Sequence, residues 1–206
     1  MIDESKWYMD VQNHNKDRRT TTNWVWNKWE RFYPSFCRKI CKKSWYTIAF
    51  LSYKKIRKDY KNIRCLIIGD GKFYKEQLMD YTNTDTDSII YKTQVSYYEL
   101  SLYHSVSDVY IHPRNELYSL VTVQGVIAKL PVISYKDVGC LIDYGIDGKN
   151  GCVIKEKDSN LFAQKIKEIY ENYTLFKNNS KKYSQYFIKN RNIDFATGQL
   201  KLALSK

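Results

Sequence analysis

The sequence predicts an α/β fold in which a parallel sheet is flanked by helices. Two observations point to it: short continuous apolar runs alternate with amphipathic segments, and turn residues follow the runs. The run of residues 65–68, Cys-Leu-Ile-Ile, stops at the Gly-Asp-Gly turn of residues 69–71. An apolar run of this length is typical of a strand buried on both faces. Strands that alternate with helices form right-handed crossover units, so we expect the strands to be parallel.

Helical spacing becomes clear from residue 43 onward. Apolar side chains recur there every three or four residues, and Lys and Arg fill the opposite face. The same interpretation along the chain places strands and helices in alternation. The predicted order is helix 43–60, strand 65–68, helix 73–79, strand 88–91, helix 97–105, strand 109–111, helix 120–128, strand 132–134, strand 152–154 and helix 162–173.

The length of 206 residues fits one domain with appendages. Residues 1–42 mix Trp, Arg and Lys without a clean period, and we predict an irregular segment there. Residues 43–173 carry the alternating pattern and form the predicted domain. Residues 174–206 are polar and rich in Lys, and we expect a C-terminal tail that is helical in part.

The composition is basic, with a net charge of +12 from 34 Lys and Arg against 22 Asp and Glu. This balance favours anionic partners such as phosphorylated small molecules, anionic lipid or nucleic acid. Because the basic residues are scattered, a solvated surface without a specific partner is the simpler interpretation. The N-terminus has no signal-peptide pattern, and no apolar run reaches about 18 residues. We therefore predict a cytoplasmic protein.

The five cysteines do not suggest a disulfide framework. Their number is odd, and Cys65 and Cys152 fall inside predicted strands, so reduced and partly buried thiols fit better. Cys37 and Cys41 are four residues apart with no histidine at a supporting distance. We therefore predict no metal site.

The segment 107–134 carries the most chemical information. A β-branched run ends at Pro113, a turn presents the carboxylate of Glu116, and a helix-like run follows. The first turn of such a helix offers unpaired backbone N–H groups and a positive dipole end, which suits a phosphate. A carboxylate beside it suits sugar hydroxyls. These features predict a site for a nucleotide-activated sugar, near the turn 69–71 because both follow strand ends.

With these residues in place, the chain resembles the C-terminal lobe of the family 4 (group 1) glycosyltransferases of the GT-B type. The resemblance runs over residues 43–173 and implies a Rossmann-like lobe that binds a nucleotide-sugar donor, while an N-terminal lobe binds the acceptor. The matching pieces are the glycine turn 67–71, the strand and its end at 106–113, the pair Glu116 and Gln124 as a Glu-x7-Glu counterpart, the helix end and strand 128–133, and the closing segment 139–151.

The resemblance assigns roles to single residues. Glu116 is the implied catalytic carboxylate, which contacts the transferred sugar and helps to stabilise positive charge on its ring. Gln124 stands where a second Glu holds the ribose hydroxyls, and its amide oxygen can accept such a bond without charge assistance. Backbone amides after Glu116 would meet the diphosphate. The other donor-binding residues that the resemblance implies are Leu117, Tyr118, Ser119, Leu120, Gly69, Gly71 and Lys43.

The chain also departs from the family pattern. The loop from Pro113 to Glu116 is one residue shorter than usual, Leu117 and Lys129 each replace a glycine, and Asp143 replaces a Glu. The first strand of the lobe and the N-terminal lobe are not recognisable. His104 and His112 are expected to be structural.

Three functions stay open. In the first, the chain is the donor lobe of a retaining enzyme that moves a hexose from a nucleotide-diphosphate sugar to a glycan or lipid-linked acceptor. That enzyme would need no cofactor or tightly held metal, would use a separate N-terminal lobe, and would contact the inner membrane face peripherally. In the second, it is a truncated, non-catalytic lobe. The third, a nucleic-acid binder, rests on charge and aromatic content; without a recognition motif, no nucleic-acid partner is expected.

Overall fold

A computed structural model describes residues 34–37, 43–69, 88–92, 95–112, 119–136, 147–191, 197–198 and 201, with the backbone alone for 34–37 and 43–47. Every structural statement below concerns these residues. The elements are β1 (Pro34–Cys37), α2 (Lys43–Asp59), β2 (Cys65–Ile68), β3 (Ile89–Lys92), α4 (Tyr97–Val106), β4 (Val109–His112), α5 (Leu120–Ile127), β5 (Val132–Tyr135), β6 (Gly151–Ile154), α7 (Ser159–Glu171) and α8 (Tyr173–Asn190).

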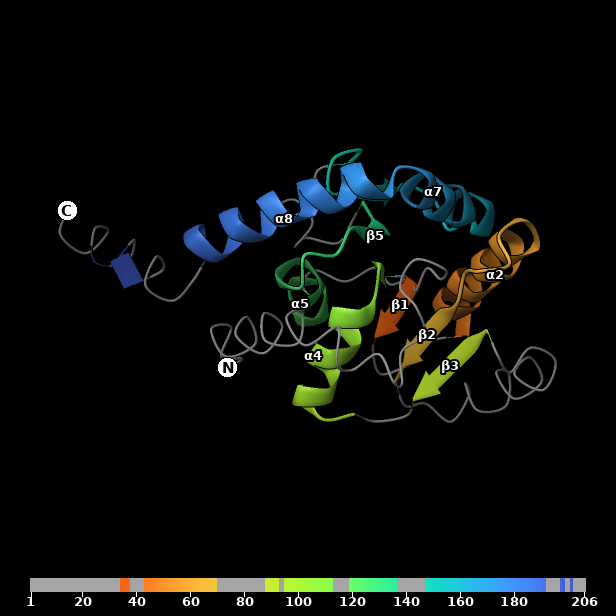
Figure 1. The fold of residues 1–206 in the computed structure, drawn as a ribbon, viewed down its shortest axis with the longest axis horizontal. Coiled ribbons are helices and arrows are strands. Elements are labelled where there is room, and N and C mark those ends of the chain that lie inside the picture. The colour runs from red at the N-terminus through yellow and green to blue at the C-terminus, as the bar shows by residue number, and fades with distance from the viewer. Residues whose placement is uncertain are drawn as a thin grey trace.

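The six strands form one sheet in the order β3-β2-β1-β4-β5-β6, and every neighbouring pair is parallel (Figure 1). The chain builds outward from β1 to β3, then returns to the other side of β1 and builds outward again to β6. The order therefore reverses between β1 and β4, which is the usual ligand position of a doubly wound sheet. The predicted α/β fold with a parallel sheet is confirmed.

The central strand is one that the sequence did not reveal. β1 lies within the segment 1–42, for which we predicted irregular structure. It pairs with strands on both sides, with Ser35 opposite Leu66 of β2 and opposite Tyr110 of β4. Its sequence, Pro-Ser-Phe-Cys, is neither a continuous apolar run nor a clean alternation. The strand forms because two neighbours satisfy its backbone groups, a cause that no local pattern records.

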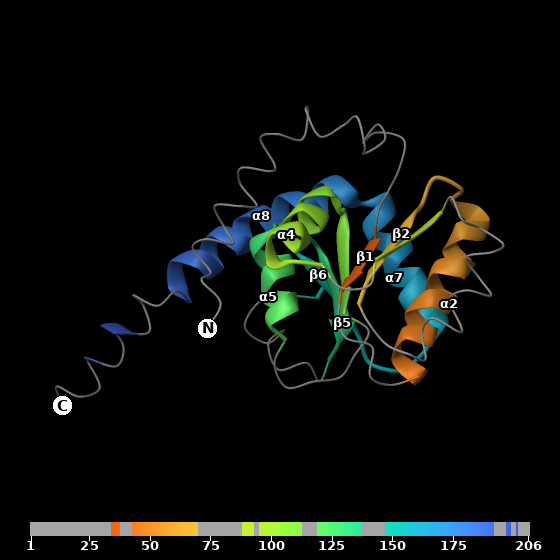
Figure 2. The same cartoon turned by 90° about the horizontal axis from the view of Figure 1, so that it is seen from below.

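Two layers of helices cover the sheet. Figure 2 shows α4 and α5 on one face and α2 and α7 on the other. Helices α2 and α7 are joined by side chains at both ends of their contact. The Lys55 Nζ atom donates to Ser159 Oγ at 2.7 Å, and the Tyr60 hydroxyl donates to Glu171 Oε1 at 2.6 Å. Both faces are therefore buried, which accounts for the continuous apolar character of the strands.

The C-terminal region predicted as a tail contains a helix that is part of the lobe. Phe176 and Phe187 of α8 are buried. The Ser184 hydroxyl donates to the Ile127 carbonyl at 3.0 Å, and the Ser180 hydroxyl donates to the Asn150 carbonyl at 3.2 Å. These contacts attach α8 to the end of α5 and to the turn before β6.

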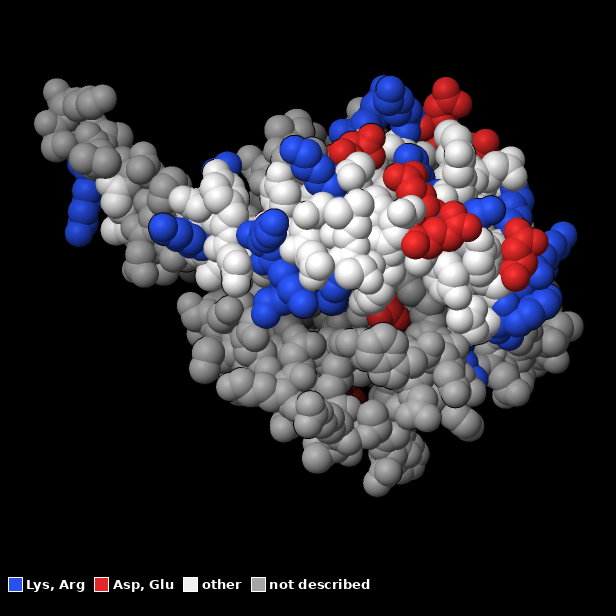
Figure 3. Space-filling model, turned by 45° about the horizontal axis from the view of Figure 1, so that its top comes forward, with Lys and Arg blue, Asp and Glu red and all other residues white. Residues whose placement is uncertain are grey.

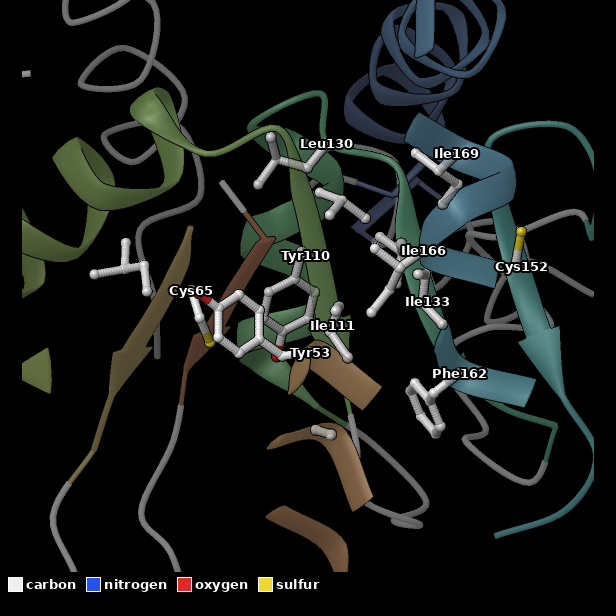
Figure 4. Packing of buried hydrophobic residues seen from close by; sticks show 14 of the residues in the cluster. Tyr53, Cys65, Tyr110, Ile111, Leu130, Ile133, Cys152, Phe162, Ile166 and Ile169 are labelled. Carbon is white, nitrogen blue, oxygen red and sulfur yellow. The ribbon is translucent and has the colours of Figure 1, made fainter. Parts of the chain in front are cut away.

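The core lies between the sheet and its helices. Figure 4 shows Ile111 and Ile133 from the sheet together with Phe162 and Ile166 from α7, and all four are fully buried. Replacing one such isoleucine with alanine typically costs 2–5 kcal/mol. Tyr53 of α2 is also buried, and its hydroxyl donates to the Ser88 carbonyl at 3.0 Å.

The thiols of Cys65 and Cys152 are buried and form no disulfide. Burial raises the pKa of the Cys65 thiol well above its ordinary value. The pKa of Cys152 rises to about 12, mainly through burial and further through Glu168. The expectation of reduced, buried thiols is confirmed for these two residues.

A glycine allows α5 to approach the sheet closely. A Cβ atom added to Gly125 would lie 3.0 Å from the ring of Tyr110 on β4, closer than real Cβ contacts normally are. Any larger residue would have to push the helix or the ring away. Gly125 thus sets the distance between α5 and β4, and with it the height of the start of α5 above the sheet.

At the end of α5, Lys129 occupies a backbone position that suits glycine. The Leu130 N–H donates to the Gly125 carbonyl at 3.0 Å, and the Lys129 N–H donates to the Val126 carbonyl at 2.9 Å. This is the Schellman arrangement, which places the residue after the C-cap in the left-handed region. Lys129 accordingly has φ of 61°. Its pKa is lowered by burial and, secondarily, by Lys181.

Replacing Lys129 with glycine is expected to stabilise the protein by about 1 kcal/mol. A non-glycine residue in the left-handed region costs about 1–2 kcal/mol, and part of that gain is offset by the entropy of glycine in the unfolded chain. Urea denaturation would measure the difference. Lys129→Ala is the matched control, because it removes the charge near Lys181 and keeps the backbone strain. An equal gain in both variants would mean that charge, and not backbone strain, is the cause.

Candidate functional site

The candidate site lies where the strand order reverses, at the carboxyl ends of β1 and β4. Because all the strands are parallel, the turns that follow them meet at this one edge of the sheet. β4 ends at His112 and α5 begins at Leu120. The segment that contains Glu116 connects these two ends. Helix α2, which begins at Lys43, follows β1 from the same edge.

The start of α5 has the features of a helix terminus that can hold an anion. Ser119 is the N-cap, and its hydroxyl accepts a hydrogen bond from the Thr122 N–H at 3.3 Å. The Val123 N–H donates to the Ser119 carbonyl at 3.2 Å. The amides of Leu120 and Val121 precede the first bonds within the helix, so they have no partner of that kind. No acidic residue lies in the first turn of α5 itself, where a negative charge would interact favourably with the positive end of the helix dipole.

Beneath this helix start lies a group of buried polar side chains. Tyr110 and His112 are two residues apart on β4 and share the face that α5 covers, since Gly125 contacts the Tyr110 ring. Ser134 of β5 pairs with His112 in the register and faces the same side. Thr122 is one turn nearer the start of α5 than Gly125, so it lies toward the carboxyl end of β4.

Two of these hydroxyls stand out. Thr122 and Ser134 are fully buried. Within the described part of the chain, neither Thr122 Oγ1 nor Ser134 Oγ has a hydrogen-bond partner. A buried hydroxyl without a partner costs free energy, and such groups often mark places that a ligand or water completes. Sequence analysis missed both residues, because a Thr inside an apolar helix and a Ser inside an apolar strand carry no distinctive pattern.

The two histidines next to the site are buried and belong to one cluster of tilted rings around Tyr110. The His104 ring of α4 lies 5.7 Å from the Tyr110 ring, and the Tyr110 hydroxyl lies 3.2 Å from His112 Nδ1. All three side chains are buried. Burial lowers the pKa of His104 to about 3, so its imidazole is neutral in the folded protein near neutral pH.

Three of the predicted donor-binding residues lie in described parts of α5 or at its cap. Ser119 is buried and caps the helix, whereas Leu120 is 42% exposed at its first position. Gln124 is one turn further along, on the same face as Leu120, and is buried. The structure therefore brings Ser119, Leu120 and Gln124 together at the edge where the strand order reverses. Their contacts with a donor remain a prediction.

The other predicted residues are placed only in part. The Gly69 N–H donates to the Lys92 carbonyl, and its own carbonyl accepts from the Tyr91 hydroxyl, each at 3.0 Å. Because the Gly69 N–H is already bonded, a nucleotide sugar would contact the Cα of Gly69 and not its amide. The first residue of α2 is Lys43, and the structure describes its backbone but not its side chain. Four other predicted residues lie wholly outside the described part of the chain: Gly71, Glu116, Leu117 and Tyr118.

Two features are absent from the described residues. No group of three or more His, Cys, Asp or Glu side chains among them is placed to hold a metal ion. None of the helices described here has the length and apolar character needed to cross a membrane.

Comparison with known proteins identifies the family. The family model described as "Glycosyl transferases group 1" matches residues 42–191, which is most of the chain. The chain belongs to the group 1 glycosyltransferases. The resemblance inferred from the sequence is confirmed, and the matched region includes α8, which packs on this group 1 lobe.

Individual relatives agree with this assignment. The chain is 30% identical over 134 residues to a protein of Methanocaldococcus jannaschii named "Uncharacterized glycosyltransferase MJ1178", a match covering 59% of this chain and 35% of the relative. The chain thus spans about a third of that curated relative. Among solved structures, the C-terminal domain of the group 1 glycosyltransferase LpcC from Francisella tularensis has a TM-score of 0.69 at 18% identity, covering 79% of this chain and 87% of that one.

A second solved structure is HepE of Anabaena in complex with UDP-glucose. Its TM-score is 0.74 at 13% identity, and the match covers 94% of this chain and 52% of HepE. At these identities the two structures establish the fold alone. Together they show that this group 1 chain has the fold of one lobe. The matched part makes up about half of HepE.

Acid is expected to destabilise the protein through His104. Its folded pKa of about 3 lies below the unfolded value of about 6.5, so only the unfolded chain takes up this proton between those limits. The contribution of neutral His104 to the free energy of unfolding is fully present above about pH 6.5. It falls as the pH is lowered, by up to about 1.4 kcal/mol per pH unit. Urea denaturation across this range would measure it. His104→Phe keeps a ring against Tyr110 and cannot titrate, so its slope should be shallower; equal slopes would contradict this account.

Proposed function

We propose that this lobe binds a nucleotide-diphosphate sugar at the edge where β4 ends and α5 begins. In the complete enzyme it would supply the hexose for transfer to a glycan or lipid-linked acceptor, with retention of configuration. The observation that carries the proposal is the start of α5. There, two amides that precede the first bonds of the helix, a first turn without acidic residues and two buried hydroxyls lie at the point where the strand order reverses.

The diphosphate would occupy the amino end of α5. The amides of Leu120 and Val121 can donate to phosphate oxygens, and the helix dipole favours the negative charge. The hydroxyls of Thr122 and Ser134 would complete their hydrogen bonds with a phosphate oxygen or with water that the donor orders beneath the helix. Leu117 and Tyr118 would contribute further amides, and Lys43 would add positive charge from the start of α2.

The two ends of the donor would be held by different side chains. Glu116 would accept hydrogen bonds from sugar hydroxyls and stabilise positive charge that develops at the reacting carbon as the bond to the diphosphate breaks. Gln124 would accept a bond from a ribose hydroxyl. Gly69 and Gly71 would leave room beside the nucleotide. These roles come from the family resemblance, and the UDP-glucose complex of the similarly folded HepE supports a sugar nucleotide as the donor.

Donor binding can be measured by calorimetry with UDP-glucose as the probe. Glu116→Ala should weaken binding about tenfold or more, because a hydrogen bond to a charged group contributes about 1.5–3 kcal/mol. Thr122→Val keeps the side-chain shape without the hydroxyl and should weaken binding about fivefold, as expected for one neutral hydrogen bond. The matched controls are Glu171→Ala and Thr174→Val, both at exposed positions toward the amino ends of the strands, and they should bind like the unmodified chain.

Undiminished binding by the Glu116 variant would contradict the catalytic carboxylate assigned here. Undiminished binding by the Thr122 variant would show that this hydroxyl does not contact the nucleotide sugar. The amides of α5 would then be the remaining proposed contact at the helix start. If none of the proteins binds UDP-glucose, the proposed donor class is wrong.

A second candidate function is a donor-binding lobe that transfers nothing by itself. The neutral Gln124 favours it, because it occupies the position implied for a ribose-binding Glu. Such a lobe would hold the donor without an acceptor site. It would act only with a partner that supplies the other half of the cleft.

The two candidates differ in an assay for UDP release from UDP-glucose with an acceptor present. The chain alone is expected to release none above background, because a single lobe leaves the donor open to water and places no acceptor beside it. Addition of a separately produced N-terminal lobe should restore release, and Glu116→Ala should abolish it again. Release by the chain alone would exclude the non-catalytic interpretation.

A further inference from the structure

Helix α8 and its two ends carry positive charge without a single acid. Residues 172–191 contain Lys177, Lys181, Lys182, Lys189 and Arg191, and no Asp or Glu. Helix α7 differs, because its lysines pair with acids along the same helix. In Figure 3, basic side chains extend along the surface toward the C-terminal end, whereas the acidic ones gather on the other part of this face. The scattered charge of the sequence is therefore partly segregated in space.

The charge lies on one side of an amphipathic helix. Residues Phe176, Ser180, Ser184 and Phe187 are buried and form the side that packs on the lobe. The opposite side contains the basic face of α8, which we define as Leu175, Lys181, Lys182, Tyr186 and Lys189; all five are exposed.

Two large apolar side chains lie among these lysines. Leu175 is 57% exposed and Tyr186 is 60% exposed. Residues 175, 182, 186 and 189 follow helical spacing and form one stripe, so both apolar residues adjoin lysines. Singly exposed apolar residues are ordinary, but an aliphatic and an aromatic side chain inside a stripe of one charge sign are typical of helices that lie in a membrane interface.

The basic face points away from the donor edge. Ser180 bonds to Asn150, directly before β6 begins, and Ser184 bonds to Ile127 at the end of α5. Both contacts lie at the amino ends of the strands, opposite the edge where β4 ends and α5 begins. A large partner can therefore cover this face and leave the donor site open.

We propose that the basic face of α8 docks the protein on an anionic lipid bilayer. The lysines would lie among the lipid phosphates, while Leu175 and Tyr186 would enter the interface between headgroups and acyl chains. Each lysine close to such a surface is expected to raise the partition constant about fivefold. A bilayer fits better than a nucleic acid, because single strands use aromatic residues in a groove, whereas this face is convex and includes an aliphatic side chain.

Vesicle co-sedimentation of the full chain tests the proposal without any nucleotide sugar, so its outcome is independent of donor binding. The protein should bind vesicles that contain about 40% phosphatidylglycerol and should not bind pure phosphatidylcholine. Raising NaCl from about 0.05 to 0.5 M should release most of it, since the screening length falls several-fold. Replacing Lys181, Lys182 and Lys189 with Gln should weaken binding about 100-fold, because three losses of about fivefold each multiply.

The matched control replaces Lys58, Lys61 and Lys155 with Gln, three exposed lysines outside α8, and should bind within about threefold of the unmodified chain. Tyr186→Ser should weaken binding with all the lysines in place, which charge attraction alone does not predict. Circular dichroism would confirm that each variant keeps its helices. Equal losses in both triple variants, or binding to a single-stranded oligonucleotide in place of the vesicles, would overturn the proposal.

Discussion

The close packing of α5 against β4 is the constraint on which the candidate site depends. Gly125 lets the helix approach until its backbone meets the Tyr110 ring, and this contact sets where the start of α5 lies relative to the sheet. The amides of Leu120 and Val121, the Ser119 cap and the Thr122 hydroxyl are all positioned by that one approach. A helix held further from the sheet would keep its dipole but would lose its alignment with the end of β4.

The same region shows how structural and functional demands differ. The core prefers apolar residues, and β4, α5 and β5 supply them almost throughout. Polar groups appear where the strands end, next to the start of the helix. His104, held neutral by burial, belongs to the structural part of this region, because it packs on Tyr110 behind the site. A buried polar group that lowers stability at such an edge is retained most readily when a ligand uses it.

The opposite end of the sheet has a different character. There α8 closes the lobe through two serine hydroxyls and two phenylalanines, and its outer side is basic. The end of α5 contributes the strained Lys129, whose left-handed backbone a glycine would adopt more easily. This group 1 lobe thus differs at its two ends: the amino terminus of α5 lies at the carboxyl ends of the strands, and a lysine-rich surface lies at their amino ends.

The sequence by itself determined the α/β class, the family and nearly every described helix and strand from α2 to α7, because each has its own period or apolar run. It also determined which loop carries Glu116 and which helix follows. Tertiary structure alone decided that Pro34–Cys37 is the central strand, since its register partners lie 31 or more residues away along the chain, as Leu66 does from Ser35 (66 − 35 = 31). It also decided that Thr122, Gln124 and Ser134 are buried, and that α8 is part of the lobe. Burial and strand order depend on contacts between distant segments, and no local pattern encodes them.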